Sequence, residues 1–204
     1  MAARLGNVVL LAGGASSRMG VPKGLVRTGA RLWIEHQLDV TNRVGAGRTI
    51  LVLGAEHERY RTEIKDLEAL AVVAINPAPE RGPFSSLQCG LAHVAGDEPT
   101  FVLPIDVPAA ADHVWASLRA ALDPATDATV PVHEEGGGHP VLLSPGLVRR
   151  LLRLDTETRL DFELRRCAVV RVPVDDARVR CNLNTVEDWD EFARRSGMNR
   201  GSGP

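Results

Sequence analysis

The sequence predicts an α/β fold, in the form of a single Rossmann-like three-layer domain with a mostly parallel, mixed sheet. Apolar runs alternate with amphipathic stretches from one end of the chain to the other, which is the pattern of strands and helices that follow one another in a parallel sheet. The strand-like runs are continuously apolar, as in strands that are covered on both faces. The chain has 204 residues, of which 44% are hydrophobic and 25% charged, and these values are typical of one soluble domain.

The first half of the chain opens with an uninterrupted apolar run that predicts a buried strand. The stretches between such runs have the spacing of helices with one buried face. In chain order we expect a strand at Asn7–Leu11, a helix at Leu32–Val40, a strand at Thr49–Leu53, a helix at Glu56–Leu67, a strand at Leu70–Ile75, a proline-rich loop at Asn76–Pro83, a helix at Ser85–Val94 and a strand at Thr100–Leu103.

The second half continues the alternation, and Pro145 stands where the first turn of a helix favours proline. We expect one domain over residues 1–198 and a flexible tail over residues 199–204, because the last residues have the composition of a linker. The expected elements are a helix at Ala109–Leu122, a strand at Ala128–Val132, a glycine-rich loop at Glu134–Gly138, a strand at Val141–Leu143, helices at Pro145–Leu154 and Leu160–Arg166, a strand at Val169–Val174 and a helix at Val186–Arg195.

Charge and cysteine usage argue against several classes of protein. Lys and Arg total 24 against 26 for Asp and Glu, whereas a general nucleic-acid binder normally has a basic excess. Cys89, Cys167 and Cys181 are widely spaced without a C-x-x-C pair, as in a reduced cytoplasmic protein. Apolar runs such as Ala69–Ile75 are far shorter than the ~18 residues of a membrane span. We therefore expect a cytoplasmic domain that binds neither nucleic acid nor membrane.

The loop after the first strand combines adjacent glycines with two cations. Gly13 and Gly14 let backbone N–H groups approach an anion, and Arg18 and Lys23 supply positive charge. Lys23 is one of two lysines in the chain, which indicates a need for a compact point charge. The loop lacks both the Gly-Lys-Ser/Thr of a Walker A loop and the G-x-G-x-x-G of dinucleotide-binding proteins. Phosphate binding is therefore favoured over a plain surface turn.

The pattern Leu-Ala-Gly-Gly-x-Ser-x-Arg-Met-Gly-x-x-Lys in Leu11–Lys23 resembles the signature loop of the MobA-like NTP transferases, which include the molybdenum-cofactor guanylyl- and cytidylyltransferases. Other landmarks extend the resemblance to Glu187-Asp188-Trp189. It implies a nucleotide-diphospho-sugar-transferase-like fold and the transfer of a nucleoside monophosphate from a Mg²⁺-bound NTP to a phosphorylated acceptor. The resemblance assigns nucleotide binding to Leu11, Ala12, Gly13, Gly14, Arg18, Lys23, Gly82, Ser85 and Ser86.

Asp106 follows a buried strand and stands between Pro104 and Pro108. A carboxylate in this position suits Mg²⁺, which prefers one or two protein carboxylates together with waters and substrate phosphates. Asp106 also resembles the magnesium-binding aspartate of the family, and we expect it to act in catalysis with Arg18 and Lys23. The alternative is that Asp106 only caps the following helix.

The segment Asn182-Leu183-Asn184-Thr185 resembles the closing motif of the family, in which an Asn or Asp helps to complete the metal site. Asn182 and Asn184 are therefore expected metal ligands. Many relatives carry aspartates here, so the metal is expected to depend mainly on Asp106. Thr185 and Asp188 also have the spacing of a capping box at the start of a helix.

Arg81–Leu87 opens a helix after the third strand, and in the family this segment helps to read the nucleobase. Leu11–Gly14 and Gly82-Pro83 favour the guanylyl type, whereas Ser85-Ser86-Leu87 is closer to the cytidylyl type. Both GTP and CTP therefore remain possible substrates. Ser85 could alternatively serve as the helix cap.

The loop Glu134–Pro140 contains His139 in a Gly-His-Pro sequence that resembles the acceptor-side loop of the cytidylyl-type members. His139 is assigned to acceptor binding, with a structural histidine in a turn as the alternative. His133 and His139 lack the helical spacing and the third ligand of a zinc site.

Together these features predict a Mg²⁺-dependent nucleotidyltransferase that uses CTP or GTP and a phosphorylated acceptor, molybdopterin by resemblance, and releases pyrophosphate. Catalysis would come from positioning and charge neutralisation without a covalent nucleophile. The alternatives are a sugar-phosphate or phospholactate-type nucleotidyltransferase and a nucleotide-binding protein without turnover. An NAD-linked Rossmann protein is disfavoured because the fingerprint is missing.

Overall fold

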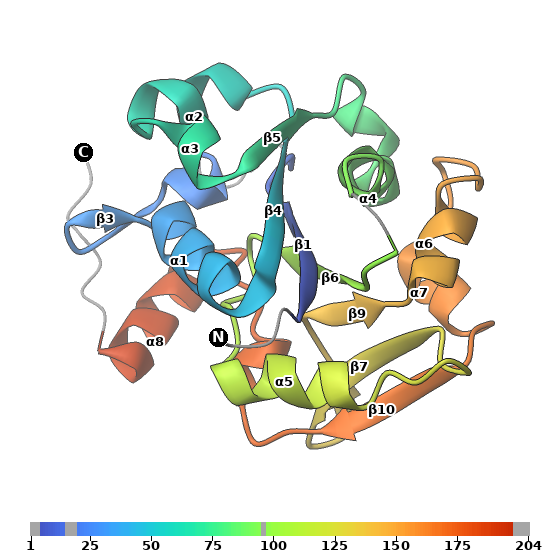
Figure 1. The fold of residues 1–204 in the computed structure, drawn as a ribbon. Helices are drawn as coiled ribbons and strands as arrows, with labels where there is room; N and C mark the ends of the chain where they lie inside the picture. The colour runs from blue at the N-terminus through green and yellow to red at the C-terminus, as the bar shows by residue number, and fades with distance from the viewer. Residues whose placement is uncertain (1–4, 15–19, 95–96, 198–204) are drawn as a thin grey trace.

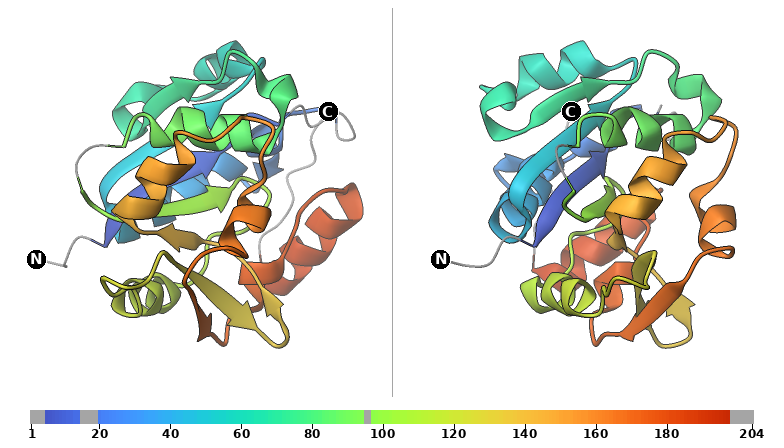
Figure 2. Two further views of the ribbon diagram at one scale, coloured as in Figure 1. Left: turned by 90° about the vertical axis from the view of Figure 1, so that its right-hand side faces the viewer. Right: turned by 45° about the vertical axis from the view of Figure 1, so that its right-hand side comes forward.

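A computed structural model describes residues 5–14, 20–94 and 97–197. In this part of the chain a central sheet is covered by helices on both faces, and Figures 1 and 2 show the three layers from different sides. The predicted α/β class, the three-layer arrangement and the mixed, mostly parallel sheet are confirmed. The tail expected at residues 199–204 lies outside the described residues.

The strands begin and end close to the apolar runs of the sequence. They are β1 (Gly6–Leu11), β2 (Arg27–Thr28), β3 (Arg31–Leu32), β4 (Ala46–Leu53), β5 (Val72–Ile75), β6 (Thr100–Pro104), β7 (Ala128–His133), β8 (Gly136–Gly137), β9 (Val141–Leu143) and β10 (Val169–Pro173). The helices are α1 (Trp33–Gly45), α2 (His57–Glu63), α3 (Leu67–Leu70), α4 (Pro83–Leu91), α5 (Asp112–Ala120), α6 (Pro145–Leu151), α7 (Leu160–Leu164) and α8 (Val186–Ser196). Short 3₁₀ turns occur at Lys23–Leu25, Pro79–Arg81 and Ala177–Arg180.

The main sheet has the strand order β10-β7-β9-β6-β1-β4-β5, and β8 pairs with β7 outside this path. β1 is parallel to both of its neighbours, β4 and β6. β9 is antiparallel to β6 and β7. The chain leaves β1 towards β4 and β5 and later returns to β6 on the other side of β1, so the strand order reverses there. In open α/β sheets, ligands bind at the carboxyl ends of the strands beside such a reversal.

The sheet separates two apolar cores because successive strand residues point to opposite faces. Val8 and Leu10 of β1 belong to the core under α1, α5 and α8, whereas Val9 belongs to the core under α4 and α6. All three are fully buried. This explains why residues 8–11 of β1 are all apolar, as expected for a strand with two covered faces.

Most expected elements differ from the structure only at their ends, but one helix is divided and two pairings were not expected. The helix expected at Glu56–Leu67 is interrupted at Asp66, which adopts a left-handed conformation (φ 54°), so α2 and α3 are separate and Leu70 ends α3 instead of starting a strand. The loop expected at Glu134–Gly138 contains β8, which pairs with the end of β7. The β2–β3 hairpin was not predicted, since two-residue strands carry no periodic pattern.

None of the helices within the described ranges is long and apolar enough to cross a membrane.

Candidate active site

The carboxyl ends of β1, β4 and β6 meet at one edge of the sheet, and backbone hydrogen bonds continue beyond the strands. The amide of Ala12 donates to Val52 O at 2.8 Å, and the amide of Ile105 donates to Leu11 O at 2.9 Å. The glycine loop after β1 and the segment after β6 are therefore held side by side. This places Asp106 next to the loop in which the sequence predicts phosphate binding.

Lys23, Asp106 and Asn184 form one cluster at this edge. Lys23 Nζ donates to Asp106 Oδ2 at 2.8 Å and to Asn184 Oδ1 at 2.5 Å. The side chains of Lys23 and Asp106 are 15% and 24% exposed, so water screens their attraction only in part. The three residues come from the 3₁₀ turn at Lys23–Leu25, the segment after β6 and the segment before α8. The structure thus brings together three of the predicted site residues from distant parts of the chain.

Helix α1 holds the backbone that carries Asp106. The indole Nε1 of Trp33 donates to Ile105 O at 2.7 Å, and Gln37 Nε2 donates to Val107 O at 2.7 Å. The amide of Ala109 donates to Gln37 Oε1 at 2.8 Å. Both side chains are buried, at 2% and 1% exposure, and buried hydrogen bonds of this kind fix a segment because breaking them leaves polar groups without partners.

Asp106 does not cap the helix that follows it. Helix α5 begins at Asp112, and its N-cap is Ala111, which makes no side-chain capping bond. The segment between Asp106 and α5 instead runs along α1, where Gln37 binds it. The capping alternative for Asp106 is therefore wrong, and its carboxylate faces Lys23.

Asn184 is positioned by the start of α8. The predicted capping box is confirmed: Thr185 Oγ1 accepts from the amide of Asp188, and Asp188 Oδ2 accepts from the amides of Thr185 and Asn184 at 2.8 and 2.9 Å. These backbone donors, first that of Thr185, lower the pKa of Asp188 below its ordinary value, and the positive charge of Lys23 adds to the effect.

Asn182 does not join the cluster through its side chain. The residue is exposed, and among the described residues its side chain has no hydrogen bond to Lys23, Asp106 or Asn184. Its carbonyl oxygen accepts from the amide of Asn184 at 3.1 Å. The predicted role of Asn182 as a metal ligand stays a prediction.

A small cavity of about 240 Å³ opens beside the glycine loop. Its walls are Ala12, Gly13, Gly14, Gly54, Ala55, Glu56, Pro79 and Glu80. Gly13 lies directly against Gly54: a Cβ on Gly54 would overlap Gly13 O and approach the Gly13 carbonyl carbon to 3.2 Å. Arg18, the second cation predicted to bind phosphate, lies outside the described residues.

Ser85 and Ser86 lie behind this loop as buried, hydrogen-bonded residues. The side-chain amide of Asn76 donates to both hydroxyl oxygens at 3.0 Å. Helix α4 is capped by Gly82 (φ 95°) with Pro83 in its first turn, and Ser85 Oγ donates back to Gly82 O at 2.8 Å. The alternative in which Ser85 is the helix cap is therefore wrong. Ser86 Oγ lies against Gly13, 3.3 Å from the position that a Cβ there would take.

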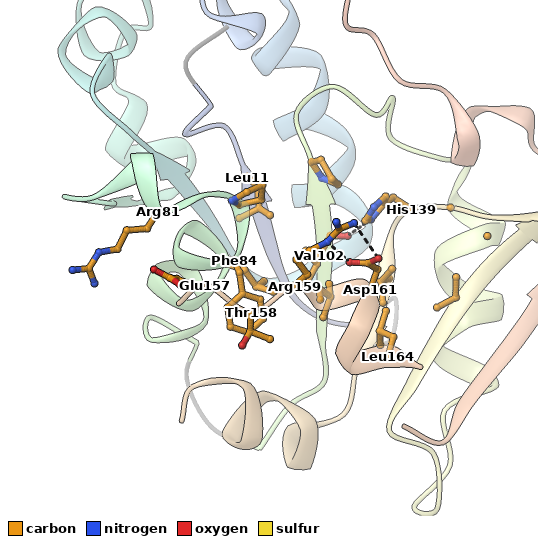
Figure 3. Close-up of a pocket in the computed structure, with 18 residues that line it drawn as sticks. Leu11, Arg81, Phe84, Val102, His139, Glu157, Thr158, Arg159, Asp161 and Leu164 are labelled. Carbon is orange, nitrogen blue, oxygen red and sulfur yellow. Dashed lines mark hydrogen bonds and ion pairs between the residues drawn. The ribbon is translucent and has the colours of Figure 1, made fainter. Parts of the chain in front are cut away.

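A larger cavity of about 680 Å³ lies over the carboxyl ends of β1 and β6, on the α4 and α7 side of the sheet. Figure 3 shows Leu11, Phe84 and Val102 among its apolar walls, and His139 and the Arg159–Asp161 ion pair at one end. Arg159 Nε donates to Asp161 Oδ1 at 2.9 Å.

His139 has a largely buried ring with one backbone partner. Its Nδ1 lies 3.4 Å from Val102 O, and burial lowers the pKa of the imidazole below its ordinary value. The negative charge of Asp106 acts on the same imidazole in the opposite direction. His139 therefore lines the large cavity at the side that approaches the Lys23–Asp106–Asn184 cluster.

Residues 8–172 match the MobA-like NTP transferase domain, which is most of the chain. The chain belongs to this family. The resemblance to this family, inferred from the glycine loop, is confirmed.

Similar proteins agree with this assignment. The chain is 27% identical to a probable molybdenum cofactor guanylyltransferase of Opitutus terrae over 195 residues, which cover 91% of this chain and 94% of the relative. It is 28% identical to the crystal structure of Rv0371c from Mycobacterium tuberculosis, with a TM-score of 0.75 over 95% of this chain and 98% of the other. A structure of Rv0371c in complex with manganese has a TM-score of 0.74 at 24% identity and covers 92% and 97% of the two chains. The match to two relatives from Bacillus cereus spans 60% of their length.

Sequence reasoning missed several residues that build this MobA-like site. Gly54 and Glu80 line the small cavity, and Trp33 and Gln37 hold the Asp106 segment. Gly54 directly follows β4, so the tendency of ligands to bind at the carboxyl ends of parallel strands could have indicated it. Trp33 and Gln37 lie on a helix with ordinary amphipathic spacing, and nothing in their local sequence indicates the contact with residues 105–109.

Proposed function

We propose that this protein is a Mg²⁺-dependent guanylyltransferase that moves GMP from GTP to the phosphate of molybdopterin and releases pyrophosphate. The observation that carries the proposal is the convergence of Lys23, Asp106 and Asn184 beside the glycine loop. The names of the relatives support guanylyl transfer and the molybdenum cofactor as the acceptor.

The residues of the cluster fit a hard divalent cation. Asp106 offers a carboxylate oxygen and Asn184 an amide oxygen, both directed at a single cationic group, the Lys23 ammonium. Oxygen donors of this kind, with few protein carboxylates, are typical of Mg²⁺ sites that also use substrate phosphates. When bound, Mg²⁺ would supply charge neutralisation at the triphosphate.

The protein's own residues would act by binding and positioning. The backbone of Gly13 and Gly14 can hold phosphate oxygens, and the Lys23 ammonium can neutralise charge that develops on the leaving pyrophosphate. A phosphate oxygen of the acceptor attacks the α-phosphorus in line, the bond from this phosphorus to the bridging oxygen breaks, and pyrophosphate departs. The large cavity beside His139 would hold the acceptor, and a neutral His139 imidazole whose Nδ1–H donates to Val102 O can accept one hydrogen bond from it at Nε2.

The small cavity supports guanine over cytosine. Glu56 and Glu80 line it, and a carboxylate can accept two parallel hydrogen bonds from N1–H and the 2-amino group of guanine. The base edge of cytosine offers one amino group instead. Glu56 pairs with Arg59 at 3.1 Å, whereas no ion pair of Glu80 occurs within the described residues. Glu80 is therefore the better candidate for reading the base.

The proposal is tested by measuring pyrophosphate release with each of the four NTPs and with molybdopterin, a sugar 1-phosphate or phospholactate as the acceptor. We expect turnover with GTP and molybdopterin. Turnover with CTP and molybdopterin would make the protein a cytidylyltransferase, and turnover only with another acceptor would support the sugar-phosphate or phospholactate alternatives. Nucleotide binding that raises Tm without turnover under any condition would indicate a binding protein.

Glu80→Gln tests the reading of the base. We expect the preference for GTP over CTP in kcat/KM to fall at least tenfold, because a neutral amide replaces the carboxylate that accepts from guanine. Glu63→Gln, on the exposed face of α2, is the matched control and should keep the preference of the unaltered protein. An unchanged preference in Glu80→Gln would remove Glu80 from base recognition.

A further inference from the structure

The Lys23 ammonium occupies the point at which the oxygen atoms of Asp106 and Asn184 converge. Asp106 and Asn184 lie 83 and 161 positions from Lys23 in the sequence, so these contacts are made by the tertiary fold. An ammonium group has three donors and no acceptor, and it can therefore satisfy the same two oxygens that a metal ion would bind. The ammonium therefore occupies the position that a metal cation would take between these oxygens.

The two oxygen-bearing residues are held more firmly than the lysine. The backbone around Asp106 is fixed by Trp33 and Gln37, and Asn184 is fixed by the capping box of α8. Lys23 reaches the cluster through a flexible four-carbon side chain from a three-residue turn. A change of occupant at this point therefore needs a rotamer change of Lys23 and leaves the oxygen atoms in place.

We propose that Lys23 is a built-in competitor of the divalent cation: in the protein without nucleotide its ammonium holds the place between Asp106 and Asn184, and a metal ion must displace it to bind. The identity of the metal in this inference rests on the proposed function. The new element is that lysine and metal exchange at the same two oxygens. The displaced ammonium is then available to an anionic ligand of the adjacent glycine loop. Binding of the metal and release of the Lys23 ammonium towards the glycine loop therefore occur together.

The exchange and a static ion pair predict different results when the charge of Lys23 is removed. In a static structural pair, the loss of the lysine changes metal affinity only through the charge repulsion that it exerts on a nearby cation. Because salt screens this repulsion, metal binding is compared at high ionic strength. In the exchange, the lysine blocks the metal site, and the apparent affinity for the metal is the intrinsic affinity multiplied by the fraction of molecules in which the site is free. Removal of the competitor must therefore increase metal affinity, although it removes a residue predicted to be essential for turnover.

The test is Mn²⁺ binding to the full chain without nucleotide at high ionic strength, measured by electron paramagnetic resonance of free Mn²⁺. Lys23→Met keeps the length of the side chain and removes the charge, and Lys65→Met is the matched control at the other lysine of the chain, which is exposed. We expect Lys23→Met to bind Mn²⁺ about tenfold more tightly than the unaltered protein, and Lys65→Met to remain within about twofold of it. Adding Asp106→Asn to Lys23→Met should remove the gain, which assigns it to this site.

Equal or weaker Mn²⁺ binding in Lys23→Met, including undetectable binding in both proteins, overturns the exchange. So does a gain that survives Asp106→Asn. Should Lys23→Met fail to fold, Lys23→Gln gives the same comparison with a polar side chain. The measurement contains neither GTP nor acceptor, so a protein inactive as a guanylyltransferase can still show the gain, and an active one can lack it.

Discussion

Gly13 and Gly54 bring the backbones of two loops into direct contact. A Cβ on Gly54 would overlap Gly13 O and lie 3.2 Å from the Gly13 carbonyl carbon and from Cβ of Pro79. The two glycines follow β1 and β4, which are neighbours in the sheet, and both line the 240 Å³ cavity. The shape of this cavity therefore depends on the absence of a side chain at residue 54.

Gly54→Ala is expected to displace the glycine loop and to weaken GTP binding at least tenfold. The overlap involves backbone atoms, which cannot move aside without shifting the loop, and overpacking of this kind costs ~1–3 kcal/mol of stability. Isothermal titration with GTP and Mg²⁺ and a thermal melt measure the two effects. Gly146→Ala in helix α6 is the control, because its Cβ meets its nearest atom at 3.8 Å. Normal GTP affinity in Gly54→Ala would contradict the role of this contact.

Asp106→Asn is expected to abolish turnover. The change keeps the size of the side chain but removes the negative charge that a hard cation requires, and Mg²⁺ must organise the triphosphate before attack. Pyrophosphate release is measured across a Mg²⁺ titration. Asp112→Asn, at the start of α5, removes an exposed carboxylate that pairs with Arg43 and should leave turnover intact. An Asp106→Asn protein with normal activity and normal Mg²⁺ dependence would rule out the metal role.

Gln37→Met is expected to lower both stability and turnover. The substitution leaves Val107 O and the amide of Ala109 without their buried partner, which costs ~1–3 kcal/mol for each unsatisfied group. It also loosens the segment that carries Asp106, so kcat should fall by more than the loss of folded protein explains.

Gln88→Met is the control that separates the loss of stability from the loss of turnover. Gln88 Nε2 donates to the carbonyl oxygens of Leu151 and Leu154 at 2.8 Å, on the opposite face of the sheet. Thermal melts and kcat are measured at a temperature at which all three proteins are folded. We expect Gln88→Met to lose stability and to keep its kcat. Equal kcat in Gln37→Met and the unaltered protein would show that α1 does not position Asp106 for catalysis.

His139 is expected to make the protein less stable in mild acid. Burial lowers the pKa of its imidazole in the folded protein, so the unfolded chain binds more protons once the pH falls below the ordinary value of about 6.5. Stability from this source is complete above pH 6.5 and declines as the pH falls towards the lower pKa of the folded state. In thermal melts between pH 7.5 and about 5, Tm of His139→Gln should fall less than Tm of the unaltered protein. His113→Gln, at an exposed position of α5, should follow the unaltered protein, and an identical decline in all three would contradict the assignment.

The helices and strands could be predicted because each depends mainly on the pattern of apolar residues within its own segment. A strand such as β1, which is buried on both faces, has a mostly apolar sequence, and residues 8–11 display this pattern directly. The break at Asp66 could not be predicted in the same way. The left-handed conformation is one of several open to an Asp in a polar stretch, and no periodic pattern in the sequence marks it.

The proximity of Lys23 and Asp106 could be expected from the sequence. Lys23 lies in the loop after β1 and Asp106 directly follows β6, and neighbouring parallel strands collect such loops at one edge of the sheet. The alternative of Ser85 as a helix cap suited its local sequence, but Gly82 takes that position and Asn76 binds the serine hydroxyl. The choice depended on a partner nine residues away.

The fold class and the family could thus be inferred from local features of the sequence, namely the hydrophobic period and the residues of the glycine loop. Which groups share a single point in space depends on the tertiary fold. It brought the ammonium of Lys23 between Asp106 and Asn184, and it placed Gln37 and Trp33 under the segment that carries Asp106. Contacts between residues 70 or more positions apart depend on how helices pack on a sheet, and no local pattern records that packing.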